Sequence, residues 1–348
     1  MKKYSTLVLI GRFQPFTNAH LEIVRRAFQL TDKLIIMIGS ANQPPTLKNP
    51  WSAPDRATMI RDALKALPVS NTSVVFGELN DYLVDGEWAE NAEIEIMKLC
   101  DYSERRNIGI IGFKKDESSF YLDDFPQWEL EDVGQIGTLN ATDIRKTYFS
   151  DAPLEFLSGV LPHGVLYSLS EWKESSVYSD LLQEKAKMEK DCKPYLSLPY
   201  PPVFVTVDNL VIYVRDTRKY ILMVQRKNHP GKGLFALPGG FFNANDTSIK
   251  SAAHRELLEE TGFVIRPTSW ESEYSPYVID TPNRSARGRT ITHVFSSFTY
   301  IGRNEELPEV KGSDDAAWAG WIPFDELQSD KCFEDHFRII QSLISEDH

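Results

Sequence analysis

Two stretches in the first half of the chain carry side chains that bind phosphate. The first, GRFQPFTNAH (11–20), directly follows the apolar run TLVLI. Gly11 permits close approach to the backbone, and the N-terminus of a helix expected at 18–30 offers N–H groups and partial positive charge to an anion. His20, in the first turn of that helix, can donate a hydrogen bond to a phosphate oxygen. On these facts alone, an ordinary packed or surface histidine is the better interpretation.

The second stretch, LNATDIRKTYF (139–149), shifts the balance. Thr142 and Arg145 lie three residues apart at an expected helix start. A hydroxyl, backbone N–H groups and a guanidinium can therefore face one phosphate chain. Together the two stretches predict a phosphate-binding site.

A third cluster consists of carboxylates near the C-terminal end. Glu256, Glu259 and Glu260 share one face of a predicted helix at i, i+3 and i+4. Three like charges this close repel one another, which favours a divalent cation with oxygen preference such as Mg²⁺. The alternative is a solvated acidic face. Arg255, the stop at Gly262 and the preceding LPGG turn disfavour that alternative.

The elements that position these groups divide the chain in two. In the first half, short apolar runs at 6–10, 34–39, 73–79 and 107–113 alternate with helical patterns. This alternation predicts an α/β, Rossmann-like parallel sheet with ligands beyond the carboxyl ends of the strands. The second half, with several strands and one strong helix, is typical of an α+β domain. The proline-rich segment KPYLSLPYPP places the boundary between domains 1–192 and 193–348.

Composition excludes several classes of protein. The 348 residues carry a formal charge of -12, which argues against broad binding of nucleic-acid backbones. Three widely spaced cysteines allow no disulfide framework or zinc spacing, so we expect reduced thiols. The apolar run before Arg12 is shorter than the ~7–15 residues of a signal h-region, and no run approaches the ~20 residues of a membrane helix. We expect a cytoplasmic protein without membrane partners.

The first two stretches together resemble the nucleotidyltransferase superfamily, with its H/T-x-G-H and I-S-x-T-x-x-R motifs. The full form of 11–20 is most similar to nicotinamide mononucleotide adenylyltransferases of the archaeal type. The similarity extends to NPWSAPDRATMI (49–60), LNDYLVDGEW (79–88) and GFKKDESSFYLDDFPQW (112–128), and covers nearly all of the first ~190 residues.

This resemblance implies attack by the 5′-phosphate of the mononucleotide on the α-phosphorus of ATP, with positioning and charge neutralisation as the means of catalysis and magnesium on the phosphates. It implies phosphate binding by four side chains: Arg12, His20, Arg56 and Arg145. It implies a hydrogen bond from Thr142 to the triphosphate, and further substrate contacts from Gly11, Phe13, Gln14 and Thr17. Trp128 either stacks on a substrate ring or packs in the core.

The chain departs from these motifs at three positions. Thr17 replaces the commoner first histidine, Ala19 replaces glycine, and Asn140 stands where serine is usual. Threonine still offers a hydroxyl. Because His20 and the arginines remain, we expect activity with altered nucleotide affinity.

The acidic cluster resembles the Nudix box, G-x5-E-x7-R-E-U-x-E-E-x-G-U. Five residues separate Gly240 from Asp246, which replaces the usual glutamate, and eight rather than seven separate Asp246 from Arg255; Phe263 takes the last aliphatic position. The resemblance implies metal-dependent hydrolysis of a nucleoside diphosphate linked to another group.

Residue roles in this second half follow from the Nudix resemblance. Glu256 and Glu260 would be the direct metal ligands, with Glu259 beside them and Arg255 orienting a glutamate. Asp314 and Asp315 are candidates for the general base or simply solubilising loop acids. Three arginines, Arg284, Arg287 and Arg289, either hold a diphosphate or ribose or form an exposed basic loop.

The tandem order resembles bifunctional bacterial nicotinamide mononucleotide adenylyltransferase/ADP-ribose pyrophosphatases. That resemblance implies ATP, nicotinamide mononucleotide, NAD and ADP-ribose as ligands, with Mg²⁺ or Mn²⁺ as cofactor; a homo-oligomer is left open. One alternative is transfer to another phosphate, such as phosphopantetheine or glycerol phosphate. A second is a Nudix half that senses ADP-ribose or NAD-related ligands without catalysis.

Overall fold

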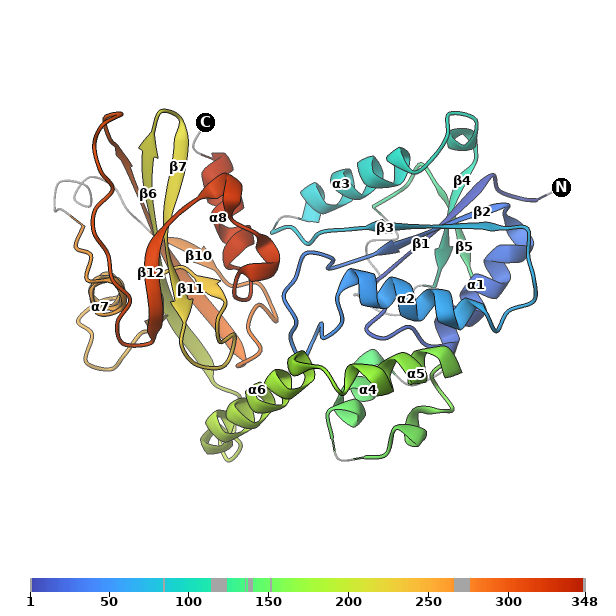
Figure 1. Cartoon of the computed structure of the whole chain (residues 1–348), viewed down its shortest axis with the longest axis horizontal. Helices are drawn as coiled ribbons and strands as arrows, with labels where there is room; N and C mark the ends of the chain where they lie inside the picture. The colour runs from blue at the N-terminus through green and yellow to red at the C-terminus, as the bar shows by residue number, and fades with distance from the viewer. Residues whose placement is uncertain are drawn as a thin grey trace. The chain divides into compact units, whose positions relative to one another are not determined.

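The computed structural model describes residues 2–83, 85–113, 124–134, 136, 140–150, 152–265 and 276–346. These residues form two compact units, 1–182 and 183–348, each with its own sheet (Figure 1). Within the described residues, no helix is long and apolar enough to cross a membrane. All three cysteines are free thiols.

The first unit is built on a parallel five-stranded sheet of order β3-β2-β1-β4-β5. Its strands are β1 (Thr6–Gly11), β2 (Lys33–Ile38), β3 (Ser73–Glu78), β4 (Ile108–Gly112) and β5 (Glu129–Asp132). The first four correspond to the predicted apolar runs, because strands buried on both faces read as continuous apolar segments. The short β5 has no such run and was not predicted.

Helices cover both faces of this sheet, as the prediction of a doubly wound fold requires. One face packs against α1 (Asn18–Leu30), α2 (Ala53–Leu64), α4 (Ala141–Tyr148) and α5 (His163–Trp172). The other face packs against α3 (Asp85–Lys98), which Figure 1 shows opposite α1 and α2. Alternate residues of β1 divide between these cores, with Leu7 and Leu9 on one side and Val8 and Ile10 on the other.

The second unit contains a mixed sheet of order β10-β11-β6-β7-β12, with β8 paired to β7 and β9 paired to β6. The strands are β6 (Val203–Arg215), β7 (Arg218–Arg226), β8 (Phe235–Ala236), β9 (Gly239–Phe241), β10 (Tyr277–Ile279), β11 (Arg289–Tyr300) and β12 (Ala316–Pro323). Helix α7 (Ile249–Thr261) packs on one face and α8 (His336–Glu346) on the other (Figure 1).

Helix α6 (Ser176–Cys192) contains the division between the units, after Leu182. The predicted boundary lies ten residues later, where the proline-rich segment ends the helix. The difference arises because the helix continues past the last contacts of the first unit. Its Glu184 carboxylate instead accepts a hydrogen bond from the Gly231 backbone N–H at 2.8 Å. The domain limits 1–192 and 193–348 therefore stay a prediction.

Candidate functional site

Thr17 is the N-cap of α1. Its hydroxyl accepts a hydrogen bond from the His20 backbone N–H at 3.4 Å, and its own N–H donates to His20 Nδ1 at 3.0 Å. This reciprocal arrangement is a capping box, in which a histidine takes the place of the usual Glu or Gln. Thr17 thus both starts the helix and holds the imidazole.

The contact with Thr17 fixes the tautomer of His20. Because Nδ1 accepts the backbone hydrogen bond, the ring proton of the neutral imidazole lies on Nε2. Burial lowers the pKa of His20 to about 4, so the ring is neutral at pH 7. The rings of Phe13 and Phe16 lie 5.2 and 5.4 Å from it. His20 therefore presents a neutral Nε2–H donor in a restrained orientation.

Gly11, Phe13 and Gln14 shape the loop that precedes α1. A Cβ at Gly11 would lie 2.8 Å from the Phe13 ring, which is buried, so the missing side chain makes room for packing. The Gln14 side chain exchanges two hydrogen bonds with the Trp51 backbone, at 2.9 and 3.2 Å. These contacts are structural, and direct substrate contacts by the three residues stay predictions.

The two predicted phosphate-binding stretches meet at Arg145. Its guanidinium donates to the Gln14 carbonyl at 2.7 Å and to the Thr142 hydroxyl at 3.3 Å. Asn140 caps α4 by accepting a hydrogen bond from the Asp143 N–H at 2.9 Å, so asparagine serves where serine is usual. Residues 131 positions apart in the chain therefore form one site. Leu139 lies outside the described residues.

Arg56 lies inside this region and differs from the expectation of a phosphate ligand. Only 1% of its surface is exposed. Its guanidinium donates to four backbone carbonyls, those of Arg12 at 2.6 Å, Gly39 at 2.7 Å, Ser40 at 3.2 Å and Ser52 at 3.2 Å. Four of its five N–H groups are thereby used. This geometry supports a positioning role at the ends of β1 and β2, and a direct phosphate contact stays a prediction.

Positive charge accumulates around the α1 N-terminus. Burial lowers the pKa of Arg145 to about 10, with repulsion from Arg12 as the second cause. The Arg12 side chain is exposed, and among the described residues it makes no ion pair. Two guanidinium groups that repel each other beside a helix N-terminus favour a bound anion.

Trp128 lies in the core on the α3 side of the sheet. It is 9% exposed and stacks on Phe125, with ring centroids 5.1 Å apart and planes inclined by 8°. The structure thus favours core packing over a substrate contact. Most of the quoted stretch 112–128, from 114 to 123, lies outside the described residues.

A cavity of about 230 Å³ lies at the carboxyl end of β3, and part of its lining belongs to the stretch LNDYLVDGEW (79–88), to which the resemblance extends. The loop after β2 borders it, because Ala41 N–H donates to Leu79 O at 3.0 Å and Ser40 Oγ donates to Asp81 at 3.0 Å. That stretch follows a strand of the parallel sheet, where ligands are expected, but the sequence assigned no individual role to its residues. The cavity is lined by Glu78, Leu79, Asn80, Tyr82, Trp88, Asn91, Ala92 and Glu95.

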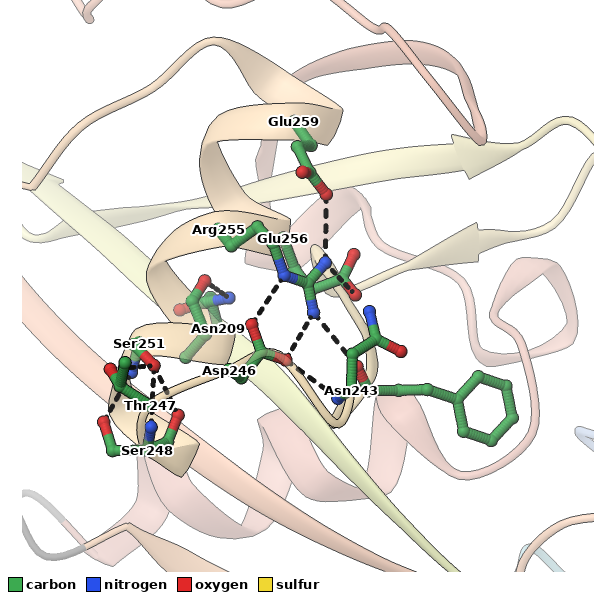
Figure 2. Close-up of polar contacts among 11 residues, drawn as sticks. Asn209, Asn243, Asp246, Thr247, Ser248, Ser251, Arg255, Glu256 and Glu259 are labelled. Carbon is green, nitrogen blue, oxygen red and sulfur yellow. Dashed lines mark hydrogen bonds and ion pairs between the residues drawn. The ribbon is translucent and has the colours of Figure 1, made fainter.

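In the second unit, Arg255 is the centre of the polar network around α7 (Figure 2). It makes two hydrogen bonds to the Asp246 carboxylate, at 2.8 and 2.9 Å, and bonds to Glu256 at 2.8 Å and Glu259 at 3.0 Å. The ion pair lowers the pKa of Asp246 to about 2. The arginine therefore orients two glutamates, as the resemblance implied.

The one-residue insertion lies ahead of the helix. Asn243 and Asp246 close a turn through hydrogen bonds of 2.8 and 3.0 Å, and α7 starts only at Ile249, with Ser248 as N-cap. The extra residue lies after this turn, between Asp246 and Arg255, and Asp246 still accepts two hydrogen bonds from Arg255. Gly262, at a φ of 67°, ends the helix.

Glu256 and Glu260 are buried carboxylates, 8% and 7% exposed. Glu260 accepts a hydrogen bond from the Gly239 N–H at 2.9 Å, and a Cβ on Gly240 would lie 2.5 Å from Glu256 Oε1. Burial, with repulsion from Glu256 as a further cause, raises the pKa of Glu260 to about 8.

A divalent cation fits this donor set, because it would offset two buried negative charges with the oxygen ligands it prefers. Glu259 is more exposed and is paired with Arg255. Across the described ranges, no group of three His, Cys, Asp or Glu side chains is assembled in metal-binding geometry. The complete set of Glu256, Glu259 and Glu260 as ligands thus stays a prediction.

Asp314 and Asp315, the two candidates for the general base, lie in different surroundings. Asp314 is exposed, and its charge acts on Glu256. Asp315 accepts a hydrogen bond from Asn228 at 3.0 Å. Ser313 N–H donates to the Glu260 carbonyl at 3.1 Å, which ties this loop to the end of α7. The assignment of Asp314 or Asp315 as general base stays a prediction.

The three arginines of the 284–289 loop differ as well. Arg284 is buried in a two-bond ion pair with Asp335, at 2.8 and 2.9 Å, so it is not part of an exposed basic loop. Arg289 is exposed and reaches Asp280 only at 4.0 Å. Arg287 is partly exposed, 3.6 Å from Glu334.

Two further charged residues near α7 were missed from the sequence. Arg226, at the end of β7, acts electrostatically on Glu260, and the buried Asp208 of β6 accepts a hydrogen bond from Thr292. Asp208 interrupts a largely apolar strand, which is a signal, but this does not say which face the residue occupies. Arg226 is the last residue of its strand and gives no such signal.

Family models match both units. The Cytidylyltransferase-like model matches residues 8–97 and the NUDIX domain model matches residues 205–343. Fold and sites together define a nucleotidyltransferase unit followed by a Nudix unit. The crystal structure of a bifunctional NMN adenylyltransferase/ADP ribose pyrophosphatase from Francisella tularensis, complexed with AMP and a manganese ion, is 35% identical with a TM-score of 0.86. The match covers 99% of both chains, and the present chain belongs to this bifunctional family.

Relatives of each half agree with this assignment. A nicotinamide/nicotinic acid mononucleotide adenylyltransferase of Acinetobacter baylyi is 34% identical over 187 residues, 53% of this chain and 95% of the relative. An ADP-ribose pyrophosphatase of Methanocaldococcus jannaschii is 33% identical over 169 residues, 49% of this chain and 88% of the relative. The first relative is an adenylyltransferase, like the class of the first unit, and the second is a pyrophosphatase, like the class of the second unit.

Proposed function

We infer that the chain is a bifunctional enzyme of NAD metabolism. The first unit transfers the adenylyl group of ATP to nicotinamide mononucleotide, giving NAD and pyrophosphate. The second hydrolyses ADP-ribose to AMP and ribose 5-phosphate. The observation that carries this proposal is the full-length similarity to the Francisella protein, and it is supported by the contact between the two predicted phosphate-binding stretches and by the buried Nudix glutamates.

In the first reaction an oxygen of the mononucleotide 5′-phosphate attacks the α-phosphorus of ATP. A new P–O bond forms as the bond to the β-phosphate oxygen breaks, and pyrophosphate leaves. No protein nucleophile is needed, so positioning and charge neutralisation carry the catalysis. His20 donates from Nε2, and Arg12 and Arg145 offset phosphate charge. A bound Mg²⁺ would neutralise further phosphate charge.

The cavity after β3 is the best place for the pyridine mononucleotide. It borders the loop whose carbonyls Arg56 holds, and its lining combines the aromatic rings of Tyr82 and Trp88 with amide side chains. Aromatic and amide groups suit a planar ring that bears a carboxamide. This position would bring the 5′-phosphate toward the cluster of arginines.

In the second reaction water attacks one phosphorus of the diphosphate, and the other phosphate leaves with its ribose. Glu256 and Glu260, with Glu259 beside them, would hold a divalent cation that activates water and neutralises the diphosphate. We propose Mg²⁺, because oxygen ligands suit it. The Gly239 N–H fixes Glu260, Arg255 orients Glu256 and Glu259, and Asp314 is the candidate base.

Several finer points belong to the proposal. ATP, nicotinamide mononucleotide, NAD and ADP-ribose are the proposed ligands, and nucleic acid is not. The location in the cytoplasm is proposed from the spacing of the cysteines, which suits reduced thiols. Self-association is left open, to be settled by sedimentation of the purified chain.

Product analysis with two separate knockouts tests both activities. His20→Ala should abolish NAD formation from nicotinamide mononucleotide and ATP while ADP-ribose hydrolysis continues. Glu260→Gln should have the opposite effect. His163→Ala is a matched control, because this exposed histidine also starts a helix but lies outside the site. Full NAD synthesis by His20→Ala would refute the first assignment, and tight binding of ADP-ribose without release of AMP would favour a sensor.

A further inference from the structure

Four side chains in the second unit form a row in which guanidinium and aromatic groups alternate. The Arg226 Cζ lies 4.1 Å from the ring centroid of Phe333, and the Arg287 Cζ lies 5.7 Å from the same ring. On its other side, the Arg287 Cζ lies 5.1 Å from the ring centroid of Phe241. We call Arg226, Phe333, Arg287 and Phe241 the arginine–aromatic row.

One end of this row lies at the Nudix carboxylates. The charge of Arg226 acts on Glu260, and that of Arg287 acts on Arg226. The other end is joined to the same carboxylates through β9, since Gly239 donates to Glu260 and Phe241 follows two residues later. Gly240, between them, leaves room for Glu256, because a Cβ on Gly240 would lie 2.5 Å from Glu256 Oε1.

Phe241 is a supported but accessible ring. It remains 39% exposed although Arg287 lies over it. Phe204 contacts it edge to face at 5.8 Å, and Tyr195 contacts Phe204 at 5.3 Å. The Arg287 Nε bonds to Ser285 Oγ at 3.2 Å, which restrains the guanidinium. A large exposed ring held in one orientation is unfavourable in water and favours a planar ligand.

We propose that Phe241, supported by Arg287, is the surface on which the base of the nucleoside diphosphate stacks. The inference rests on the proposed hydrolysis of a nucleoside diphosphate and adds the recognition of its base. The diphosphate lies at the glutamates, on which the charge of Arg226 acts, and it extends toward the side of Arg287 that faces Phe241. The base then lies over the exposed part of Phe241. Every base offers a π-face to an aromatic ring, and a flanking guanidinium strengthens the contact.

Phe241→Ala tests this assignment with a neighbouring residue as control. Loss of a base–aromatic stack should raise the KM for ADP-ribose by roughly 5- to 150-fold, with kcat within about threefold. Phe241→Trp should keep the KM close to that of the unaltered chain. Phe242→Ala should also leave the KM unchanged, because Phe242 is 38% exposed and no described ring contact joins it to the row. An unchanged KM in Phe241→Ala, or an equal rise in Phe242→Ala, overturns the proposal.

Product inhibition identifies which half of the substrate touches Phe241. Inhibition by AMP should weaken in Phe241→Ala, whereas inhibition by ribose 5-phosphate should not; equal weakening would contradict a base contact. Calorimetric binding of ADP-ribose without divalent cation gives a readout that needs no turnover. If the unaltered chain released no AMP from ADP-ribose, the proposed hydrolysis would be refuted. Loss of ADP-ribose binding in Phe241→Ala would still support stacking of the base on Phe241.

Discussion

The imidazole of His20 is held by the backbone of Thr17, and this contact decides which nitrogen faces a ligand. Burial keeps the ring neutral, so it can donate from Nε2 without carrying charge. The positive charge comes instead from Arg12 and Arg145. In the proposed reaction, hydrogen bonding and charge neutralisation would thus fall to different side chains.

The first prediction concerns the titration of His20. A pKa of about 4 in the folded state lies below the ordinary value of 6.5, so the unfolded chain binds a proton first as the pH falls. The contribution of His20 to stability is therefore complete above pH 6.5 and is lost as the pH falls toward 4. NMR titration of the ring protons should give a midpoint near pH 4. A midpoint near 6.5 would contradict a neutral, restrained imidazole.

Helix α1 depends on the same residue pair at the scale of an element. The sequence motif allows histidine or threonine at position 17, and here threonine serves as the helix cap. The residue that departs from the commoner histidine thus has a structural role of its own. An N-cap hydroxyl contributes about 1 kcal/mol to stability.

The second prediction follows from this cap. Thr17→Ala should lower the free energy of unfolding of the first unit by about 1 kcal/mol, and Thr17→Ser should retain most of it. NAD formation should fall with the alanine variant, because the hydroxyl that contacts His20 Nδ1 at 2.9 Å is lost. Urea denaturation and steady-state kinetics measure the two effects. Equal stability of all three proteins would show that Thr17 does not act as a cap.

The turn before α7 is the corresponding element of the second unit. Asp246 fixes Arg255, and Arg255 fixes Glu256 and Glu259 (Figure 2). Residues that orient metal-binding groups affect activity without touching the substrate. Asp246 is therefore a positioning residue in spite of the insertion that follows it.

The third prediction tests that chain of contacts. Asp246→Ala should lower ADP-ribose hydrolysis about 10- to 100-fold and raise the cation concentration needed for half-maximal activity. Asp325→Ala is a suitable control, because it removes only an exposed ion pair with Arg218. If the cation concentration for half-maximal activity were unchanged in Asp246→Ala, Arg255 would orient the glutamates without help from Asp246.

At the scale of the whole molecule, the chain consists of two units with separate cores and separate chemistry. A ligand that binds one unit should stabilise that unit by mass action. The glutamates of α7 lie entirely in the second unit. A divalent cation alone, without nucleotide, should therefore protect the second unit.

The fourth prediction uses this separation. Mn²⁺ at a hundred times its dissociation constant should stabilise the second unit by about 2.7 kcal/mol. Hydrogen-exchange mass spectrometry should show the added protection in 203–265 and 276–346. Glu260→Gln should remove most of it. Equal protection of the first unit would indicate cation binding outside the Nudix glutamates.

Much of the fold could be predicted because local patterns determine it. Apolar runs mark strands β1 to β4, and the periodicity of α1 and α7 fixes their buried faces. Short strands such as β5 and β9 carry too few residues for a pattern, and pairing with neighbouring strands defines them. The division between the units within α6 likewise reflects contacts with distant residues, such as that of Glu184 with Gly231, rather than the local sequence.

The residues of both sites could be selected from the sequence by motif and spacing, since the chemistry of phosphate and cation binding limits which side chains serve. Only the tertiary structure separates those that face the site from those that support it. Arg56 and Arg145 have the same side chain, yet backbone carbonyls accept hydrogen bonds from most of the N–H groups of Arg56 and from fewer of those of Arg145. Arg284 and Arg287 lie three residues apart, yet only Arg284 is buried in an ion pair with Asp335. The physical reason is that burial and hydrogen-bond partners come from distant segments, which local sequence does not encode.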